Sequence, residues 1–195
     1  MKQYDLFGGS APEERDAAPR FPEGFRYQPE LITVAMEREL IAQFQSLPFK
    51  EFEFHGYTGK RRVVSFGWKY DFSSRHLNKV DDMPDFLRAL RVPAAKFAGL
   101  APEDLQHVLV TEYGPGAAIG WHRDKDVFDE IVGISLSAAC TFRLRRRLGE
   151  NWERVNVRAE PRSAYLLSGE ARLVWEHSIP PVEELRYSVT YRNLR

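Results

Sequence analysis

The spacing of apolar residues divides the chain into two parts with different periodicities. Between residues 33 and 47, apolar side chains recur every three or four positions, which predicts an amphipathic helix with Thr33 as its N-cap. A second apolar stripe starts near Pro84 and predicts another helix, which we expect to break or kink at Pro93. Beyond residue 105 the apolar positions form short segments rich in β-branched and aromatic residues, so this part is predicted to be mainly β-strand.

The C-terminal part of the sequence contains seven such strand-like segments. They read HVLVTEY, EIVGISLS, CTFRLRR, RVNVR, SAYLLS, ARLVWEH and RYSVTYR, and turn residues separate them. Many short strands after a helical and mixed N-terminal region favour a mostly β, α+β fold: a sandwich or jelly-roll barrel with helices packed on one outer face. Residues 1–20 are rich in Gly, Pro, Ala and charge and predict a flexible tail, so we expect one folded domain over residues 21–195.

The overall composition limits the partners and the compartment that we expect. Lys plus Arg and Asp plus Glu both total 28, so the net charge is zero and any nucleic-acid surface would have to be local. The apolar runs are too short to cross a bilayer, and the N-terminal segment has no apolar stretch of signal-peptide length. Cys140 is the only cysteine, which excludes an internal disulfide. These features favour a monomeric cytoplasmic protein without membrane contact.

The stretch GWHRDKD, residues 120–126, combines groups that can bind a metal. In an extended segment successive side chains point to opposite faces, so His122 and Asp124 project to the same side. Two histidines and one carboxylate on one face of a metal are typical of non-haem Fe(II) oxygenases. His177 in VWEHSIP, several strand lengths beyond Asp124, is the candidate second histidine. The other histidines have no matching spacing and are assigned to the surface or the core: His55, His76 and His107.

The segment RYSVTYR, residues 186–192, alternates strictly between polar and apolar positions. On a strand its polar residues would share one face, and they are Arg186, Ser188, Thr190 and Arg192. One interpretation is an amphipathic surface strand whose arginines face water. The other is that both guanidinium groups face into the barrel, where they need an anionic partner because an unpaired buried charge is very unfavourable. A dicarboxylate co-substrate would meet that need, since arginine binds carboxylates through two parallel hydrogen bonds.

Five sequence elements together resemble those of the AlkB-type Fe(II)- and 2-oxoglutarate-dependent dioxygenases. They are EYGPG, WHRDKD, DEIVGISLS, GEARLVWEHSI and RYSVTYR, and they extend in this order from residue 112 to residue 192. The resemblance implies a double-stranded β-helix, the jelly-roll or cupin-like fold, preceded by a helical and nucleotide-recognition region. It also implies that His122, Asp124 and His177 bind Fe(II).

The same resemblance implies how 2-oxoglutarate binds. Arg186 would pair with its distal carboxylate, assisted by Tyr113, and Arg192 would contact the end that chelates the metal. Thr111 and Ser188 stand where the family frequently has asparagine. Both carry a hydroxyl group that can donate and accept a hydrogen bond, so we expect them to contribute to the same site.

The activity that the resemblance implies is oxidative demethylation of N-alkylated bases in DNA, with RNA as a second substrate class. Conversion of 2-oxoglutarate to succinate and CO2 accompanies the oxidation, and the methyl group leaves as formaldehyde. Two alternatives remain open. The same iron chemistry could act on transfer RNA or another RNA, because GKRRVVSFG and DEIVGISLS also resemble segments of AlkB relatives that work on RNA. A protein of another class would be a non-catalytic jelly-roll binding module.

Aromatic residues in FGWKYDF, residues 66–72, are candidates for holding a base. They occupy every second position and predict one stripe on a single strand, which could equally belong to the core. An enzyme that modifies a base must extrude it from the stack, and the resemblance places Trp68, with Tyr70 beside it, against the extruded base. Asp126 matches a carboxylate that reaches the exocyclic amine of the base; its alternative is a solvated turn.

Three further segments suggest contacts with partners. The basic clusters GKRR at 59–62 and FRLRRR at 142–147, the second in a predicted hairpin closed by LGEN, could contact phosphates or could be solvated. In the tail, QYDLF resembles the peptide with which bacterial repair and replication proteins bind the sliding clamp, so that the protein would be bacterial. The clamp contacts would then be Gln3, Leu6 and Phe7. The alternative is a tail that folds onto the domain.

Overall fold

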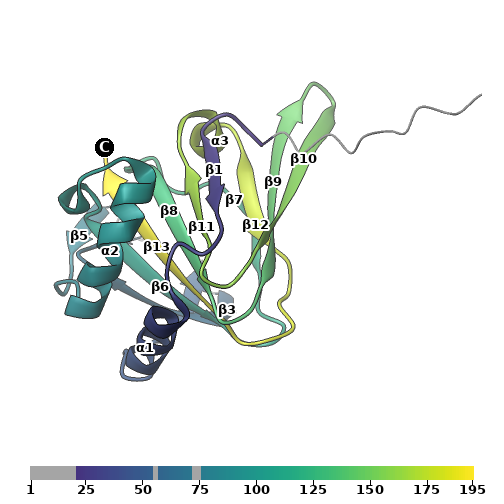
Figure 1. Cartoon of the computed structure of the whole chain (residues 1–195). Coiled ribbons are helices and arrows are strands. Elements are labelled where there is room, and N and C mark those ends of the chain that lie inside the picture. Colours follow the sequence, from purple (N-terminus) through teal and green to yellow (C-terminus); the bar gives the residue numbers. More distant parts are fainter. Residues whose placement is uncertain (1–20, 55–56, 72–75) are drawn as a thin grey trace, which may run out of the picture.

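Two β-sheets, the major and the minor sheet, pack face to face (Figure 1). The computed structural model describes residues 21–54, 57–71 and 76–195, with the backbone alone at residues 53, 54, 57, 58, 69–71, 76 and 77. From β6 onward the chain alternates between the two sheets, except at the hairpin of β9 and β10 within the minor sheet, which is the arrangement of a double-stranded β-helix. The predicted jelly-roll fold, mostly β with flanking helices, is confirmed.

The major sheet has seven strands in the order β1-β11-β8-β13-β6-β3-β2. Its members are β1 (Phe25–Gln28), β2 (Lys50–Phe54), β3 (Tyr57–Phe66), β6 (His107–Tyr113), β8 (Phe128–Leu136), β11 (Ala164–Leu167) and β13 (Arg186–Leu194). β13 lies at the centre and pairs antiparallel with both β6 and β8. The segment that contains Arg186 and Arg192 is therefore a central strand and not a surface strand.

The minor sheet has four strands in the order β10-β9-β12-β7. They are β7 (Ile119–His122), β9 (Cys140–Leu148), β10 (Asn151–Ala159) and β12 (Glu176–Ile179). β9 and β10 form the predicted hairpin, and Gly149 in its turn has a φ of 59°, a conformation that favours glycine. A separate two-stranded sheet consists of β4 (Trp68–Asp71) and β5 (His76–Lys79).

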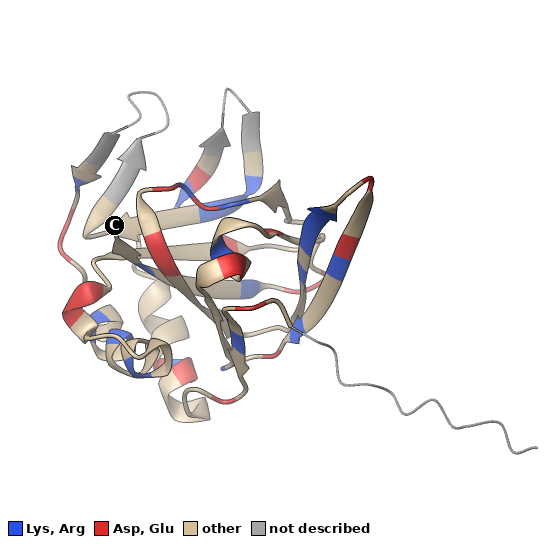
Figure 2. Ribbon diagram, turned by 90° about the horizontal axis from the view of Figure 1, so that it is seen from above, with Lys and Arg blue, Asp and Glu red and all other residues tan. Residues whose placement is uncertain are grey.

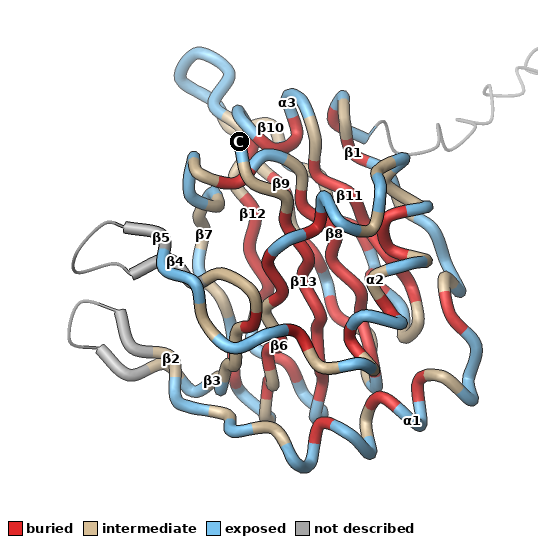
Figure 3. Tube along the Cα trace, turned by 90° about the vertical axis from the view of Figure 1, so that its left-hand side faces the viewer, coloured by how far each residue is buried: buried red, intermediate tan, exposed pale blue. Residues whose placement is uncertain are grey.

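Two helices cover the outer face of the major sheet, and buried positions follow its central strands (Figure 3). In α1 (Val34–Phe44) the Thr33 hydroxyl accepts a hydrogen bond from the Met36 backbone N–H at 3.2 Å, which confirms the predicted N-cap. Apolar residues of α1 and α2 (Asp85–Ala98) form one cluster with the outward residues of β13, among them Tyr187, Val189 and Tyr191. Among the described helices, none has the length and hydropathy to cross a membrane.

Of the break or kink predicted at Pro93, the break is wrong, because α2 continues through this residue to Ala98. Proline removes only its own N–H bond to the preceding turn, and the carbonyl that loses this bond belongs to Ala89, which is exposed to water. Buried residues on both sides of Pro93, including Leu90 and Ala94, hold the helix against the sheet. The helix ends instead at Gly99, which adopts the left-handed conformation of a C-cap.

Two strand predictions need correction. ARLVWEH is not one strand: its first part forms the short helix α3 (Gly169–Leu173), in which Ala171 faces the same buried side as Trp175. FGWKYDF is not one strand either. Phe66 ends β3 in the core, and Gly67, with a φ of 79°, turns the chain so that Trp68 begins β4. Local patterns could not reveal these changes of direction, because helical and strand spacings overlap in short apolar runs.

Candidate metal and co-substrate site

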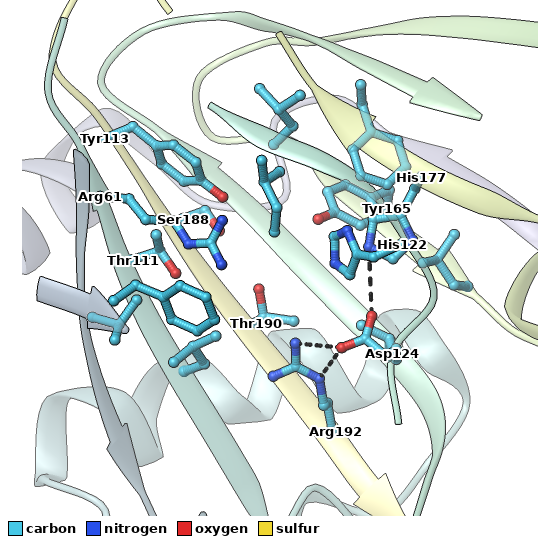
Figure 4. A pocket seen from close by; sticks show the side chains of 18 residues that line it. Arg61, Thr111, Tyr113, His122, Asp124, Tyr165, His177, Ser188, Thr190 and Arg192 are labelled. Carbon is cyan, nitrogen blue, oxygen red and sulfur yellow. Dashed lines mark hydrogen bonds and ion pairs between the residues drawn. The ribbon is translucent and has the colours of Figure 1, made fainter. Parts of the chain in front are cut away.

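A pocket lies between the two sheets, and residues from both sheets line it (Figure 4). Seven of the predicted site residues are in its wall: Thr111, Tyr113, His122, Asp124, His177, Ser188 and Arg192. Figure 4 shows two ends, with Tyr113, Thr111 and Ser188 at one and the two histidines with Asp124 at the other. The polar face of β13 runs between these ends, so the strand alternation that predicts this face is confirmed.

The structure brings the three predicted metal ligands together. His122 at the end of β7 is the direct cross-strand neighbour of His177 in β12, and their ring centroids lie 4.2 Å apart. Asp124 follows β7 by two residues, and its Oδ2 lies 3.5 Å from His177 Nε2. One donor atom from each of the three lies within 4.8 Å of the others. This convergence fits a single ion held on one face by two imidazoles and a carboxylate.

The protonation states at this cluster suit a divalent cation. Burial opposes ionisation of Asp124, but the charge and hydrogen bond of Arg192, together with the neighbouring His177 and His122, outweigh it and hold the pKa of the carboxyl well below its usual range. Burial, followed by the neighbouring His122, lowers the pKa of His177 to about 3. Burial also lowers the pKa of His122, whose Nδ1 lies 2.8 Å from the Gly120 carbonyl oxygen. At neutral pH the site therefore offers one carboxylate and two neutral imidazoles, the forms that bind metals.

Arg192 supports the cluster from the major sheet. Its Nε and Nη2 donate to Asp124 Oδ1 at 2.8 and 2.7 Å, which fixes the carboxylate and leaves Oδ2 toward His177. Behind it, Arg192 Nη1 lies 3.3 Å from Nδ1 of His107, a buried residue whose pKa burial lowers well below its usual value. His107, assigned from the sequence to the surface or core, is thus a core residue that contacts the site through Arg192.

The buried positive charge of Arg186 is not balanced by the described residues. Its side chain is fully buried, with Nε donating to Ser135 Oγ at 3.2 Å and the guanidinium carbon 5.1 Å from the Tyr113 ring centroid. Nη1 and Nη2 have no hydrogen-bond partner among the described residues. A buried guanidinium with two free nitrogens fits a carboxylate that binds through both oxygens, as the distal end of 2-oxoglutarate would.

Arg61 is a pocket residue that the sequence analysis missed. It was grouped with the basic cluster at 59–62, but its guanidinium carbon lies 3.9 Å from the Phe52 ring centroid inside the pocket wall, and burial lowers its pKa. Its neighbour Arg62 points away and forms a two-pronged pair with Glu112 at 2.7 and 2.9 Å. Strand alternation in RRVVSF, which places Arg61 on the side of Val63, is the signal that could have separated the two.

The structure does not bring the predicted base-contacting residues into the pocket wall. Trp68 is half-buried on β4, and Asp126 is exposed in the connection between β7 and β8. The side chain of Tyr70 lies outside the described residues, as do the predicted clamp contacts Gln3, Leu6 and Phe7.

A family model described as the 2OG-Fe(II) oxygenase superfamily matches residues 26–193. An Arabidopsis thaliana protein named "Alkylated DNA repair protein ALKBH8 homolog" is 27% identical over 193 residues, covering 86% of this chain and 54% of the relative. A Xenopus tropicalis protein named "tRNA (carboxymethyluridine(34)-5-O)-methyltransferase alkbh8" is 30% identical over 128 residues, covering 62% of this chain and 20% of the relative. The chain thus spans about half, or less, of the length of these two relatives.

Solved structures support the same assignment at the level of the fold. OsALKBH1 aligns with a TM-score of 0.66 at 16% identity, covering 90% of this chain and 99% of the other. A Pseudomonas putida prolyl-4-hydroxylase aligns with a TM-score of 0.57 at 15% identity, covering 88% and 93%. With the ligand cluster and the family match together, the chain belongs to the 2OG-Fe(II) oxygenase superfamily and is a dioxygenase that uses Fe(II) and 2-oxoglutarate.

Proposed function

We propose that this dioxygenase removes N-linked alkyl groups from bases in DNA, with RNA as a second substrate class. The observation that carries the proposal is the combination of a His122, Asp124 and His177 cluster with a neighbouring buried arginine, Arg186, whose terminal nitrogens have no described partner. A binding module without catalysis would need no such combination. The name of the Arabidopsis relative, an alkylated DNA repair protein, supports a nucleic-acid substrate.

In this proposal the two ends of the pocket have different tasks. His122, Asp124 and His177 would hold Fe(II) and leave its remaining positions open. Arg186 would bind the distal carboxylate of the co-substrate, beside Tyr113. Bound iron and 2-oxoglutarate would supply the oxidising chemistry with O2 as the oxidant: one oxygen atom of O2 enters succinate as 2-oxoglutarate loses CO2, and the other is transferred to the alkyl carbon. The resulting hydroxyalkyl amine would release formaldehyde from a methyl group and regenerate the free base.

The protein residues would mainly orient and shield these reactants. Arg192 keeps Asp124 ionised and in one orientation, so that the carboxylate neither takes up a proton nor rotates away from the ion. The hydroxyl groups of Thr111 and Ser188 line the end of the pocket near Tyr113, where they can hydrogen-bond the co-substrate. Apolar residues of both sheets complete the wall and exclude water, among them Ile131, Phe142 and Leu167.

An alkylated base would have to leave the base stack to reach a pocket between two sheets. Trp68 and Asp126 remain our candidates for holding the extruded base. Trp68→Ala should raise KM for an alkylated oligonucleotide, whereas the rate of succinate formation in the absence of nucleic acid should change less. Arg61, a buried cation of the pocket wall for which the described residues provide no ion pair, is a further candidate for a substrate contact.

The deciding experiment measures formaldehyde and succinate with methylated single-stranded DNA, duplex DNA and RNA in parallel. We expect equimolar formaldehyde and succinate from at least one substrate, and no products from Asp124→Ala. Anaerobic protein with Fe(II) and 2-oxoglutarate should also show the weak visible charge-transfer band of the chelate. Succinate formation without formaldehyde from any of the three substrates would contradict demethylation.

Transfer RNA is the second candidate substrate, because the Xenopus relative is named for a transfer-RNA modification. The same panel, extended by transfer RNA, separates the two candidates. A kcat/KM at least about tenfold higher on RNA than on DNA, a difference of about 1.4 kcal/mol in transition-state binding, would favour the second.

Clamp binding and a cytoplasmic location also remain proposals. Deletion of residues 1–8 should eliminate binding to a bacterial sliding clamp while turnover on short oligonucleotides stays the same. Unchanged clamp binding after the deletion would contradict the assignment of Gln3, Leu6 and Phe7.

A further inference from the structure

Arginine and tryptophan side chains alternate in a row across the outer face of the minor sheet. The order is Arg143, Trp121, Arg145, Trp152 and Arg147, and we call this row the Arg-Trp ladder. Its guanidinium carbons lie 5.0 and 4.3 Å from the Trp121 ring and 4.1 and 5.1 Å from the Trp152 ring. Such cation–π contacts fix the orientation of arginine side chains that would otherwise be mobile.

The ladder faces away from the pocket. Trp121 precedes the pocket residue His122, and Arg143 and Arg145 alternate with Phe142 and Leu144, which lie in the core between the sheets. The helices α1 and α2 lie on the other side of the molecule, over the major sheet (Figure 1). The ladder therefore belongs neither to the oxidation site nor to the hydrophobic core.

The charge on this face is not balanced by the sheet itself. β10 adds two outward arginines, Arg154 and Arg158, and Figure 2 shows basic positions on both strands of the hairpin. Arg154 is the direct cross-strand neighbour of Arg145, and two like charges in opposite positions destabilise a sheet. Glu176 pairs with Arg145, and Glu160, just beyond β10, pairs with Arg158. Among the described residues, these five arginines thus have two acidic partners.

The opposite face of the same hairpin shows the contrast. There Arg146 is paired with both Glu153 and Glu170, at 2.7 and 2.9 Å. On this face the arginine is therefore paired with acidic residues, whereas on the outer face the arginines outnumber their acidic partners. An unbalanced row of preorganised guanidinium groups is suited to an anionic partner with regularly repeated charges.

We infer that the Arg-Trp ladder, with Arg154 and Arg158, binds the phosphate backbone of a nucleic-acid strand and so supplements the pocket in holding a long substrate. Outward residues on one strand repeat about every 6.8 Å, close to the separation of successive phosphates in an extended strand. Arginine contacts to phosphate need no base sequence, so the surface would hold DNA or RNA without selecting the modified base. This inference rests on the proposed nucleic-acid substrate.

The test uses two double variants with the same change in charge. In the first, Arg147→Glu and Arg154→Glu alter the ladder face; in the second, Arg38→Glu and Arg88→Glu alter exposed residues of α1 and α2. Binding of an unmodified, labelled 20-nucleotide single strand is measured by fluorescence anisotropy at several salt concentrations. We expect the ladder variant to bind at least about tenfold more weakly. The negative slope of log K against log salt should become shallower by about 1.4, the value for two lost phosphate contacts on a single strand. The helix variant should stay within about twofold of the unchanged protein.

Three results would overturn the inference: equal weakening in both variants, unchanged binding of the ladder variant, or displacement of the oligonucleotide by polyglutamate as readily as by unlabelled strand. If the ladder variant folds poorly by circular dichroism, Arg147→Gln with Arg154→Gln repeats the measurement with a milder change. Turnover separates this inference from the proposed function. The ladder variant should oxidise a methylated trinucleotide normally and show a higher KM on the 20-nucleotide substrate. If the unchanged protein oxidises no methylated nucleic acid but binding still depends on the ladder, the proposed function fails and the surface assignment stands.

Discussion

The two sheets of the jelly roll contribute to the pocket in different ways. The minor sheet supplies the imidazoles, on β7 and β12, whereas the central strand of the major sheet supplies Arg192 to the pocket wall and carries Arg186 beside Tyr113 of that wall. Helices cover the outer face of the major sheet, so β13 is buried on both sides and its arginines are held in low-dielectric surroundings. A guanidinium in such surroundings attracts an anion far more strongly than one at the surface. The major sheet is therefore suited to bind the co-substrate and the minor sheet to complete the metal site.

The two ends of the pocket also differ in whether the buried arginine is paired with another protein residue. At the metal end, Arg192 and Asp124 compensate each other's charge. At the other end, Arg186 keeps two nitrogens without a described partner. The difference predicts opposite responses when each group is removed.

Removal of a metal ligand should have the largest effect. His177→Ala should lower succinate formation at least about 100-fold, because the loss of a direct ligand exceeds the 10- to 100-fold effect of losing a supporting residue. The anaerobic charge-transfer band should disappear as well. Glu176→Gln, on the opposite face of the same strand, is the matched control and should keep the band. Activity above about a tenth of normal in His177→Ala would remove this residue from the ligand set.

Replacement of the two arginines by methionine should separate the ends of the pocket. Arg186→Met should weaken 2-oxoglutarate binding by about 2 to 5 kcal/mol, or 30-fold and more, yet raise the stability of the metal-free protein by about 1 kcal/mol, because two unpaired buried nitrogens are removed. Arg192→Met should lower that stability by about 3 kcal/mol, because it leaves the buried Asp124 carboxylate unpaired. Urea unfolding with a chelator present measures both. Stability changes of the same sign would contradict the proposed difference.

The outer face of β13 should affect stability without affecting turnover. The Tyr191 hydroxyl donates to the Leu87 carbonyl of α2 at 2.7 Å in buried surroundings. Tyr191→Phe should therefore lower the free energy of unfolding by about 1 to 1.5 kcal/mol while kcat stays the same. Tyr187→Phe is the control on the same face, and it should have a smaller effect because the Tyr187 hydroxyl bonds to the partly exposed Glu112. A fall in kcat for Tyr191→Phe would mean that the two faces of β13 are not independent.

A further prediction concerns pH. Burial keeps His107, like His122 and His177, neutral in the folded protein, whereas an unfolded histidine takes up a proton below about pH 6.5. The free energy of unfolding of the metal-free protein should therefore fall as the pH decreases below about 6.5, by up to about 1.4 kcal/mol per pH unit for each of these histidines. His107→Gln should remove the contribution of the major sheet and reduce this slope. An unchanged slope would assign the pH dependence to the two histidines of the minor sheet alone.

Part of this fold follows from local patterns that no tertiary contact needs to supplement. The N-cap at Thr33 is a contact within one helical turn, and the hairpin of β9 and β10 is closed by a glycine turn. ARLVWEH and FGWKYDF are each predicted as one strand, but in each segment the chain changes direction. A buried helical turn redirects the chain in ARLVWEH, and a glycine with positive φ does so in FGWKYDF. In neither segment does the spacing of the apolar residues show a break.

The sequence by itself determined which groups could act: the His122 and Asp124 pair, the second histidine at His177, and the polar side of β13, since successive side chains of any extended strand point to opposite faces. Tertiary structure decided what these groups meet. Only the packing of the two sheets could decide that the face of β3 with Arg61 borders the pocket, join His107 to Arg192, and leave Arg186 without a described partner. Burial and pairing depend on residues that are far apart in the chain, and no local pattern records them.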